Sequence, residues 1–124
     1  LRCAKAWRQW EASALSIMPD PARHDAFGDP HFAIAFASIE CHYFHHKGFF
    51  AHDGALLDGM GNIDHLPGAI IQGRYDVVTP PLTAHELSLR WPKASFQIVE
   101  AAGHATAEPG ITAALIAATN RYAA

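Results

Sequence analysis

The stretch that decides the fold is Pro67-Gly68-Ala69-Ile70-Ile71-Gln72-Gly73-Arg74-Tyr75-Asp76-Val77-Val78. Residues 68–72 are short, apolar and β-branched between two glycines, as is typical of a buried parallel strand. A helix is predicted from Pro80 or Pro81 to Arg90, with Thr79 as its cap, followed by a second strand over 95–99 and a helix over 111–122. This alternation of strands and helices predicts right-handed connections within a parallel sheet, and therefore an α/β fold.

Residues 1–66 have a different pattern, helical and aromatic, with no convincing strand. A helix over 1–16 is predicted to end at Pro19-Asp20-Pro21. Asp29 and Pro30 form an N-cap and first-turn pair for a second helix, which Gly48 ends. A third helix over 55–63 is weakened by Gly59 and Gly61. We therefore expect two parts, 1–66 and 67–124, and since two strands are too few for a stable parallel sheet, we expect the sheet to be incomplete.

Composition excludes several classes of function. The 124 residues are half hydrophobic with a net charge of −3, and the nine Lys and Arg form no block, which argues against a nucleic-acid or anionic-membrane surface. No apolar run approaches the roughly 18 residues of a membrane span. Cys3 and Cys41 lack a CxxC pattern and indicate free thiols in a reducing, cytoplasmic compartment. Because Leu1 is not an initiator Met, we expect a fragment.

Two residues with catalytic potential follow the predicted strands. Asp76 comes after the first strand and His104 after the second, each in a loop that precedes a helix. Functional groups in open α/β sheets collect beyond the carboxyl ends of the strands. An Asp before a His also matches the last two members of a Ser, Asp, His order along the chain. Either residue alone is more often a turn or loop residue, whereas the two together favour an acid–histidine pair.

A nucleophile is not part of the pattern. The serines are Ser13, Ser16, Ser38, Ser88 and Ser95, and none lies in a Gly-x-Ser-x-Gly elbow. We expect the missing serine, and the oxyanion hole, upstream of Leu1.

Several motifs together resemble bacterial proline iminopeptidases, over nearly the whole chain. The motifs that resemble the helical cap of that family are Trp7-x-x-Trp10-Glu11, the segment from Ala33 to Phe44 that contains Glu40, and Gly48-Phe49-Phe50. The motifs that resemble its acid and histidine loops are Gly73-Arg74-Tyr75-Asp76-Val77-Val78 and Gly103-His104.

The resemblance implies a serine hydrolase of the α/β-hydrolase fold that cleaves an N-terminal proline from peptides, without metal or cofactor. The chain would be the C-terminal part of that fold: a helical cap over 1–66, then β-α-β-α core over 67–124. Asp76 would be the triad acid and His104 the base. Glu11 and Glu40 would bind the imino group of the substrate, and Val78 and Thr79 would line the proline pocket. The partners would be such peptides and the upstream half of the same enzyme, with a homo-oligomer left open.

The resemblance makes a physical prediction about the two glutamates. Without a bound cation, two carboxylates in an apolar cap repel each other, which raises the pKa of at least one of them. Glu40 lies in an apolar run, where an unpaired charge is costly. Cys41 and Ala105-Thr106-Ala107 depart from the family pattern and leave the pocket shape open.

Three alternatives remain. His42 and His46 have a helical i, i+4 spacing that can chelate zinc, with His45 and His52 nearby, but no HExxH pattern accompanies them. Another α/β-hydrolase, such as an esterase, an epoxide hydrolase or a broader aminopeptidase, is the second alternative; an ester or an epoxide would not need paired carboxylates. A truncated remnant that acts as an interaction module would need no serine.

Overall fold

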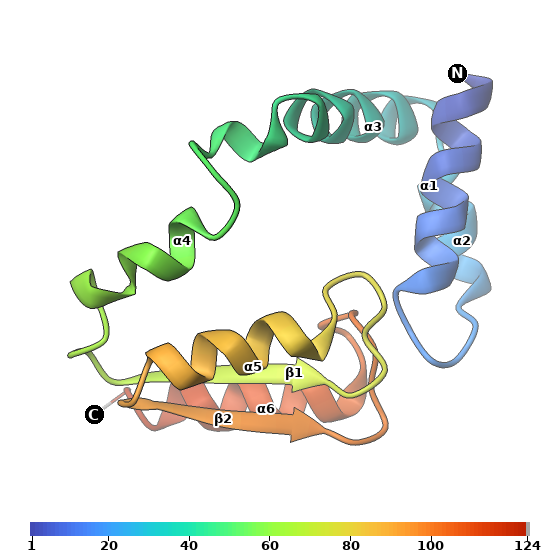
Figure 1. The fold of residues 1–124 in the computed structure, drawn as a ribbon. Helices are drawn as coiled ribbons and strands as arrows, with labels where there is room; N and C mark the ends of the chain where they lie inside the picture. Colours follow the sequence, from blue (N-terminus) through green and yellow to red (C-terminus); the bar gives the residue numbers. More distant parts are fainter. Residues whose placement is uncertain (124) are drawn as a thin grey trace. The chain divides into compact units, whose positions relative to one another are not determined.

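The computed structural model describes residues 1–123, which contain six α-helices and a two-stranded sheet (Figure 1). The elements are α1 Arg2–Ala14, α2 Pro21–Phe27, α3 Pro30–His45, α4 Ala55–Asp58, β1 Gly68–Gly73, α5 Pro81–Arg90, β2 Ala94–Val99 and α6 Pro109–Asn120, with short 3₁₀ helices at Lys47–Phe49 and Gly59–Asn62. The predicted mixed α/β class with two parallel strands is confirmed.

The chain divides into two compact units. The first comprises Leu1–Ala14 and Met18–Ala55, and in it α1 packs against α2 and α3. The second comprises Leu15–Ile17 and the chain from Leu56 onward, including both strands. The assignment of 1–66 as a lid and 67–124 as a core stays a prediction, since compactness alone assigns no role to either part.

Two helices begin at the same sequence signal. The Asp29 carboxylate accepts hydrogen bonds from the backbone N–H groups of His31 and Phe32 at 3.1 and 3.0 Å, as an N-cap does, and Pro30 follows it. Asp20 caps α2 in the same way, accepting from Arg23 N at 3.0 Å. Sequence analysis treated Pro19-Asp20-Pro21 only as a break and missed α2, although Asp20-Pro21 is the same cap pair as Asp29-Pro30.

Glycines set the limits of the middle helices. Helix α3 ends at His45, close to the predicted end at Gly48, and the chain then has positive φ at Lys47, Gly48 and Phe49, of 52°, 63° and 63°. The helix predicted over 55–63 was wrong in its length. Only Ala55–Asp58 is α-helical, and Gly59–Asn62 continues as a 3₁₀ turn, consistent with the low helix propensity of Gly59 and Gly61.

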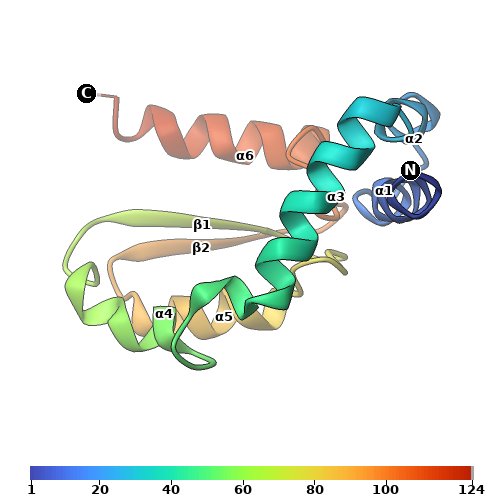
Figure 2. The same ribbon diagram turned by 90° about the horizontal axis from the view of Figure 1, so that it is seen from above.

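In the second unit, β1 and β2 pair in parallel register from Gly68 opposite Ala94 to Gly73 opposite Val99. Helices α5 and α6 lie on opposite faces of the two strands (Figure 2), and α6 turns Ile111, Ala114 and Ala118 inward. Among the described residues each strand has one paired edge.

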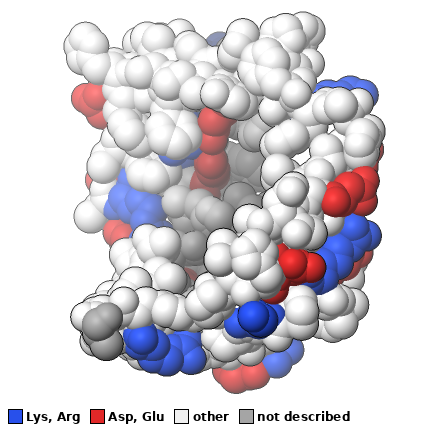
Figure 3. Space-filling model, turned by 90° about the vertical axis from the view of Figure 1, so that its left-hand side faces the viewer, with Lys and Arg blue, Asp and Glu red and all other residues white. Residues whose placement is uncertain are grey.

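Apolar side chains are not fully covered. Leu82, Leu89 and Ile116 are 66%, 71% and 55% exposed, and most of the buried hydrophobic residues are alanines. On the face in Figure 3, basic and acidic side chains are interspersed among uncharged residues. Between residues 1 and 123, no helix combines the length and the apolar character required to cross a membrane.

Candidate active site

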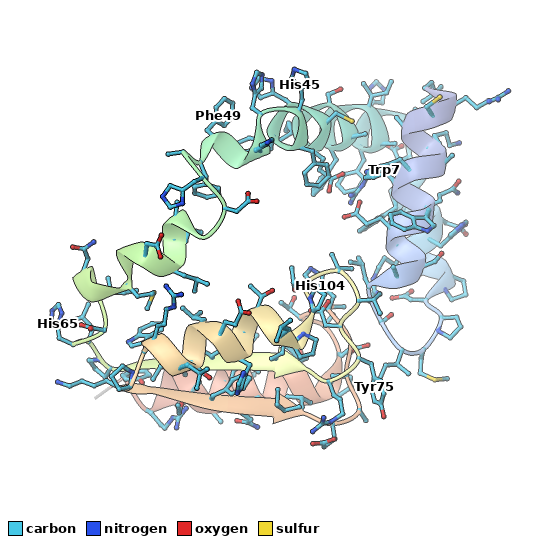
Figure 4. All side chains as sticks on the ribbon, in the orientation of Figure 1. Trp7, His45, Phe49, His65, Tyr75 and His104 are labelled. Carbon is cyan, nitrogen blue, oxygen red and sulfur yellow. The ribbon has the colours of Figure 1, made fainter. Side chains whose placement is uncertain are left out.

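The structure brings Asp76 and His104 together at the carboxyl end of the sheet. Asp76 lies three residues after β1 and His104 five residues after β2. The Nδ1 atom of His104 is 3.0 Å from the Oδ2 atom of Asp76, and Figure 4 shows His104 among the loops at the arrowhead end of the strands. The Asp76 side chain is only 6% exposed and that of His104 is 35% exposed. An imidazole held at one edge by a buried carboxylate, with its other edge accessible, is suited to proton transfer.

Gly73 explains why the two loops can approach each other. A Cβ atom at Gly73 would lie 2.0 Å from the carbonyl oxygen of Gly103, so only glycine fits there. Two backbone hydrogen bonds join the loops, from Arg74 N to Val99 O at 3.0 Å and from Tyr75 N to Ala102 O at 2.9 Å. The position of the histidine loop therefore depends on glycine, which has no side chain, at the end of β1.

The histidine loop is also held from its other side. The carbonyl oxygen of Leu15 accepts hydrogen bonds from His104 N at 2.9 Å and Ala105 N at 2.7 Å. The Glu108 carboxylate accepts from Gly103 N and, at 2.9 Å, from Ile17 N. Leu15 and Ile17 thus belong to the support of the site, which sequence analysis did not anticipate.

Asp76 is surrounded by donors. Its Oδ1 atom accepts from the backbone N–H groups of Val78 at 2.9 Å and Thr79 at 2.8 Å, and its Oδ2 atom accepts from the Thr79 hydroxyl at 2.9 Å and from Gln72 Nε2 at 3.3 Å. The prediction that Thr79 caps α5 was wrong: Pro80 holds that position and no side chain caps the helix, while the Thr79 hydroxyl donates to Asp76. The role of Val78 and Thr79 in a proline pocket stays a prediction.

These donors control the charge of Asp76. Burial alone would raise its pKa, but hydrogen bonds from the Thr79 backbone, the His104 ring and the Thr79 hydroxyl together hold the pKa below its ordinary value. Asp76 is therefore ionised at neutral pH. An ionised Asp76 favours the His104 tautomer that carries its proton on Nδ1, leaving Nε2 as the basic atom.

The contact between Thr79 and Asp76 gives a stability prediction. Thr79→Val keeps the shape but removes a hydrogen bond to a buried carboxylate, which should lower the free energy of unfolding by about 1.5–3 kcal/mol at pH 7. Because the Asp76 pKa is lowered in the folded state, its contribution is present above the ordinary pKa of 3.8 and is lost as the pH falls through the folded value.

The difference in unfolding free energy between the parent protein and Thr79→Val should therefore shrink in strong acid. Urea unfolding at several pH values would measure it. Thr83→Val, at an exposed position of α5, is the matched control. An equal loss for both variants would contradict a specific role for the Thr79 hydroxyl.

In the first unit, Glu11 and Glu40 meet at one guanidinium nitrogen. Nη1 of Arg8 forms ion pairs with Glu11 Oε2 and, at 3.2 Å, with Glu40 Oε1. The Trp7 indole N–H also donates to Glu40 Oε2 at 3.0 Å. Helix α1 supplies Trp7, Arg8 and Glu11 from adjacent turns, and α3 supplies Glu40. The cost of the Glu40 charge in an apolar run is thus offset by a cation and an indole.

The prediction that the pKa of at least one of the two carboxylates is raised is confirmed for Glu11, whereas Arg8 beside them was not predicted. The guanidinium is 2% exposed and lies over the rings of Phe36, Phe27 and Phe32, at 3.7, 4.5 and 5.5 Å from their centroids. The pKa of Glu11 is nonetheless raised, chiefly by burial and partly by Glu40, while Arg8 acts to lower it. The i, i+3 spacing of Arg8 and Glu11 was the available signal.

The histidine-rich segment does not form a metal centre with other ligands. The His42 and His46 rings lie 4.7 Å apart, and His46 stacks on Phe49. Across residues 1–123, no group of three or more His, Cys, Asp or Glu is arranged to hold a metal ion. Cys3 and Cys41 are free thiols.

The fold and the site together define an α/β protein with an acid–histidine pair beyond the carboxyl ends of parallel strands. The chain is 46% identical over 121 residues to a "Probable proline iminopeptidase" of Leptolyngbya boryana, 43% identical over 121 residues to a proline iminopeptidase of Arabidopsis thaliana, and 44% identical over 123 residues to one of Xanthomonas citri. These matches cover 98%, 98% and 99% of the chain.

The chain is homologous to the proline iminopeptidases. It spans 38%, 32% and 39% of the length of these three relatives, so it corresponds to about a third of each. No family model matches the chain.

Proposed function

We propose that this chain provides the acid and the histidine of a serine hydrolase that releases N-terminal proline from peptides. The observation that carries the proposal is the 3.0 Å contact between Asp76 and His104 beyond the ends of two parallel strands. Homology to proline iminopeptidases supports the same activity.

The chemical roles follow from the geometry of the pair. His104 Nε2 takes the proton of a serine hydroxyl as the serine attacks the proline carbonyl, and later gives it to the leaving amine. Asp76 holds the ring through Nδ1 and stabilises the imidazolium that forms. The serine would come from a Gly-x-Ser-x-Gly elbow elsewhere in the enzyme, because none of the five serines of this chain lies in one.

The architecture that fits this chemistry is the α/β-hydrolase fold. Residues 67–124 would form its C-terminal core and 1–66 its lid. Two observations support neighbouring strands and helices from the upstream part of the same enzyme. Within the described residues, β1 and β2 each have one unpaired edge, and Leu82, Leu89 and Ile116 are exposed. A cytoplasmic location stays a prediction from cysteine usage, and assembly into a homo-oligomer stays open.

Glu11 and Glu40 would bind the substrate's amine. An N-terminal proline carries a secondary ammonium, and carboxylates that are 18% and 15% exposed would interact with that charge more strongly than carboxylates in water. The same paired carboxylates would have no use in an esterase or an epoxide hydrolase.

A substrate series in an enzyme of the relatives' length that carries this chain tests the activity. A prolyl amide with a free amine should be cleaved, whereas its N-acetylated form, which has lost the positive charge, should have kcat/KM lower by about 30-fold or more. An uncharged nitrophenyl ester should react by the same acid–histidine chemistry. The measurement is steady-state kinetics with the three substrates.

The 124-residue chain alone is the control and should show no turnover, because it has no nucleophile elbow. Equal cleavage of the free and acetylated prolyl amides would contradict amine recognition. If amides of other amino acids are cleaved faster than the prolyl amide, the enzyme is a broader aminopeptidase and not specific for proline.

A further inference from the structure

Arg8 is an unusual residue to find at the centre of a cation-binding site. It is the one large side chain that is fully buried among the described residues, with 2% exposed. One of its nitrogens, Nη1, contacts both carboxylates of the pair proposed to bind the substrate's ammonium. A second nitrogen, Nε, is buried and has no acceptor among residues 1–123. An incompletely satisfied buried guanidinium is costly to the fold, which argues for a use beyond packing.

The charges around Arg8 can be counted from its contacts. Helix α1 contributes Glu11, α3 contributes Glu40, and α2 contributes only the uncharged ring of Phe27. With both glutamates ionised, the cluster of Arg8, Glu11 and Glu40 has one net negative charge. That charge matches a single ammonium group. Without Arg8 the cluster would have two negative charges in a partly buried place, where like charges disfavour joint ionisation.

We propose that Arg8 determines the charge selectivity of the amine site, as a fixed counter-ion that leaves the Glu11–Glu40 pair with one net negative charge for a monocationic amine. This inference rests on the proposed function and deepens it. Arg8 is a specificity-determining residue and takes no part in bond making.

The packing of Arg8 supports a fixed ion over a mobile one. Its guanidinium lies 3.7 Å from the centroid of Phe36 and is enclosed by two further rings, which hold it by cation–π contacts. A buried guanidinium does not lose its proton at any pH that the protein survives. The counter-charge is therefore constant.

Charge compensation tests the inference, in an enzyme of the relatives' length that carries this chain. Glu11→Gln leaves Arg8 and Glu40, a cluster with no net charge, and should lower kcat/KM for a prolyl amide by about 30-fold or more. Adding Arg8→Met to Glu11→Gln returns the cluster to one negative charge. The double variant should recover at least about tenfold of the loss, mainly in KM.

The double variant should also fold, because Met suits the apolar surroundings of Arg8 and a buried ion pair is removed as a unit. Arg8→Lys keeps the charge and should stay close to the parent enzyme in its selectivity. Arg2→Met removes an exposed charge from the same helix and should change nothing.

The outcomes separate this inference from the proposed function. A double variant that folds, by circular dichroism, but is no better than Glu11→Gln would overturn the role of Arg8 while leaving prolyl hydrolysis intact. Rescue that is equally large for an uncharged ester would also overturn it, since a charge effect should be confined to amine substrates. If the parent enzyme hydrolyses the ester but not the prolyl amide, the proposed function itself fails.

Discussion

His104→Ala is expected to abolish turnover of both a prolyl amide and an uncharged ester, with kcat lower by about 10⁴-fold or more. The size of the loss follows from the position of the ring. Asp76 holds Nδ1 at 3.0 Å, and the side chain is still 35% exposed, so Nε2 is the basic atom that a serine hydroxyl can reach. Among the described residues, only His104 is paired with Asp76 in this way, and the alanine side chain has no atom that can accept the serine proton.

His65→Ala is the matched control for this experiment. His65 is also a histidine of the second unit, but it is exposed and precedes β1, whereas the acid loop follows that strand. Its replacement should leave both activities unchanged. Steady-state kinetics at saturating substrate would measure the effect on kcat, and circular dichroism would verify that the fold persists. Retention of more than about a hundredth of the activity in His104→Ala would exclude His104 as the general base.

Sequence patterns predicted the elements around the site well. The apolar, β-branched segment before Asp76 and the alternation of helix and strand after it are local sequence signals. They correctly predicted β1, α5, β2 and α6. The order of Asp76 and His104 after their strands predicted their meeting, because parallel strands end at the same edge of a sheet.

Contacts across elements were not predictable in the same way. Thr79 has the character of a helix cap, but the N-cap of α5 is Pro80, one residue later, and the Thr79 hydroxyl donates to the buried Asp76 carboxylate. The need for glycine at position 73 comes from a loop 30 residues later in the chain, whose Gly103 oxygen would be 2.0 Å from a Cβ. Such close contacts between distant segments depend on tertiary packing, which the periodicity of a sequence does not predict.

The burial of Arg8 and its ion pair with Glu40 were likewise not predictable from local sequence. In the sequence Arg8 is one of several basic residues near Trp7, and its i, i+3 spacing to Glu11 is the local feature that distinguishes it from the exposed Arg2. Its burial depends on three aromatic rings from α2 and α3, and its charge on Glu40, which is 32 residues away. A pair of glutamates could be recognised by resemblance, but the cation between them required the packing of three helices.

Glu40→Gln is expected to slow prolyl substrates selectively, and the structure sharpens the reason. In the parent protein Glu40 accepts from Arg8 and from the Trp7 indole. The substitution keeps the shape but leaves Arg8 and Glu11 as a neutral pair, so no net charge remains for the substrate's ammonium. Removing one partner of a partly desolvated charge pair costs about 2–5 kcal/mol, which is roughly 30-fold to several thousand-fold in kcat/KM.

The loss from Glu40→Gln should be confined to substrates with a free N-terminal amine, because Asp76 and His104 belong to the other unit and keep their mutual contact. A nitrophenyl ester should therefore react nearly as before. Adding Glu11→Gln should cost less than the sum of the two single losses, since both carboxylates would hold one cation. Glu86→Gln, at an exposed position of α5, controls for the loss of a carboxylate as such. If Glu40→Gln slows ester and prolyl amide equally, Glu40 has only a structural role, and the activity that remains supported is that of a hydrolase without amine recognition.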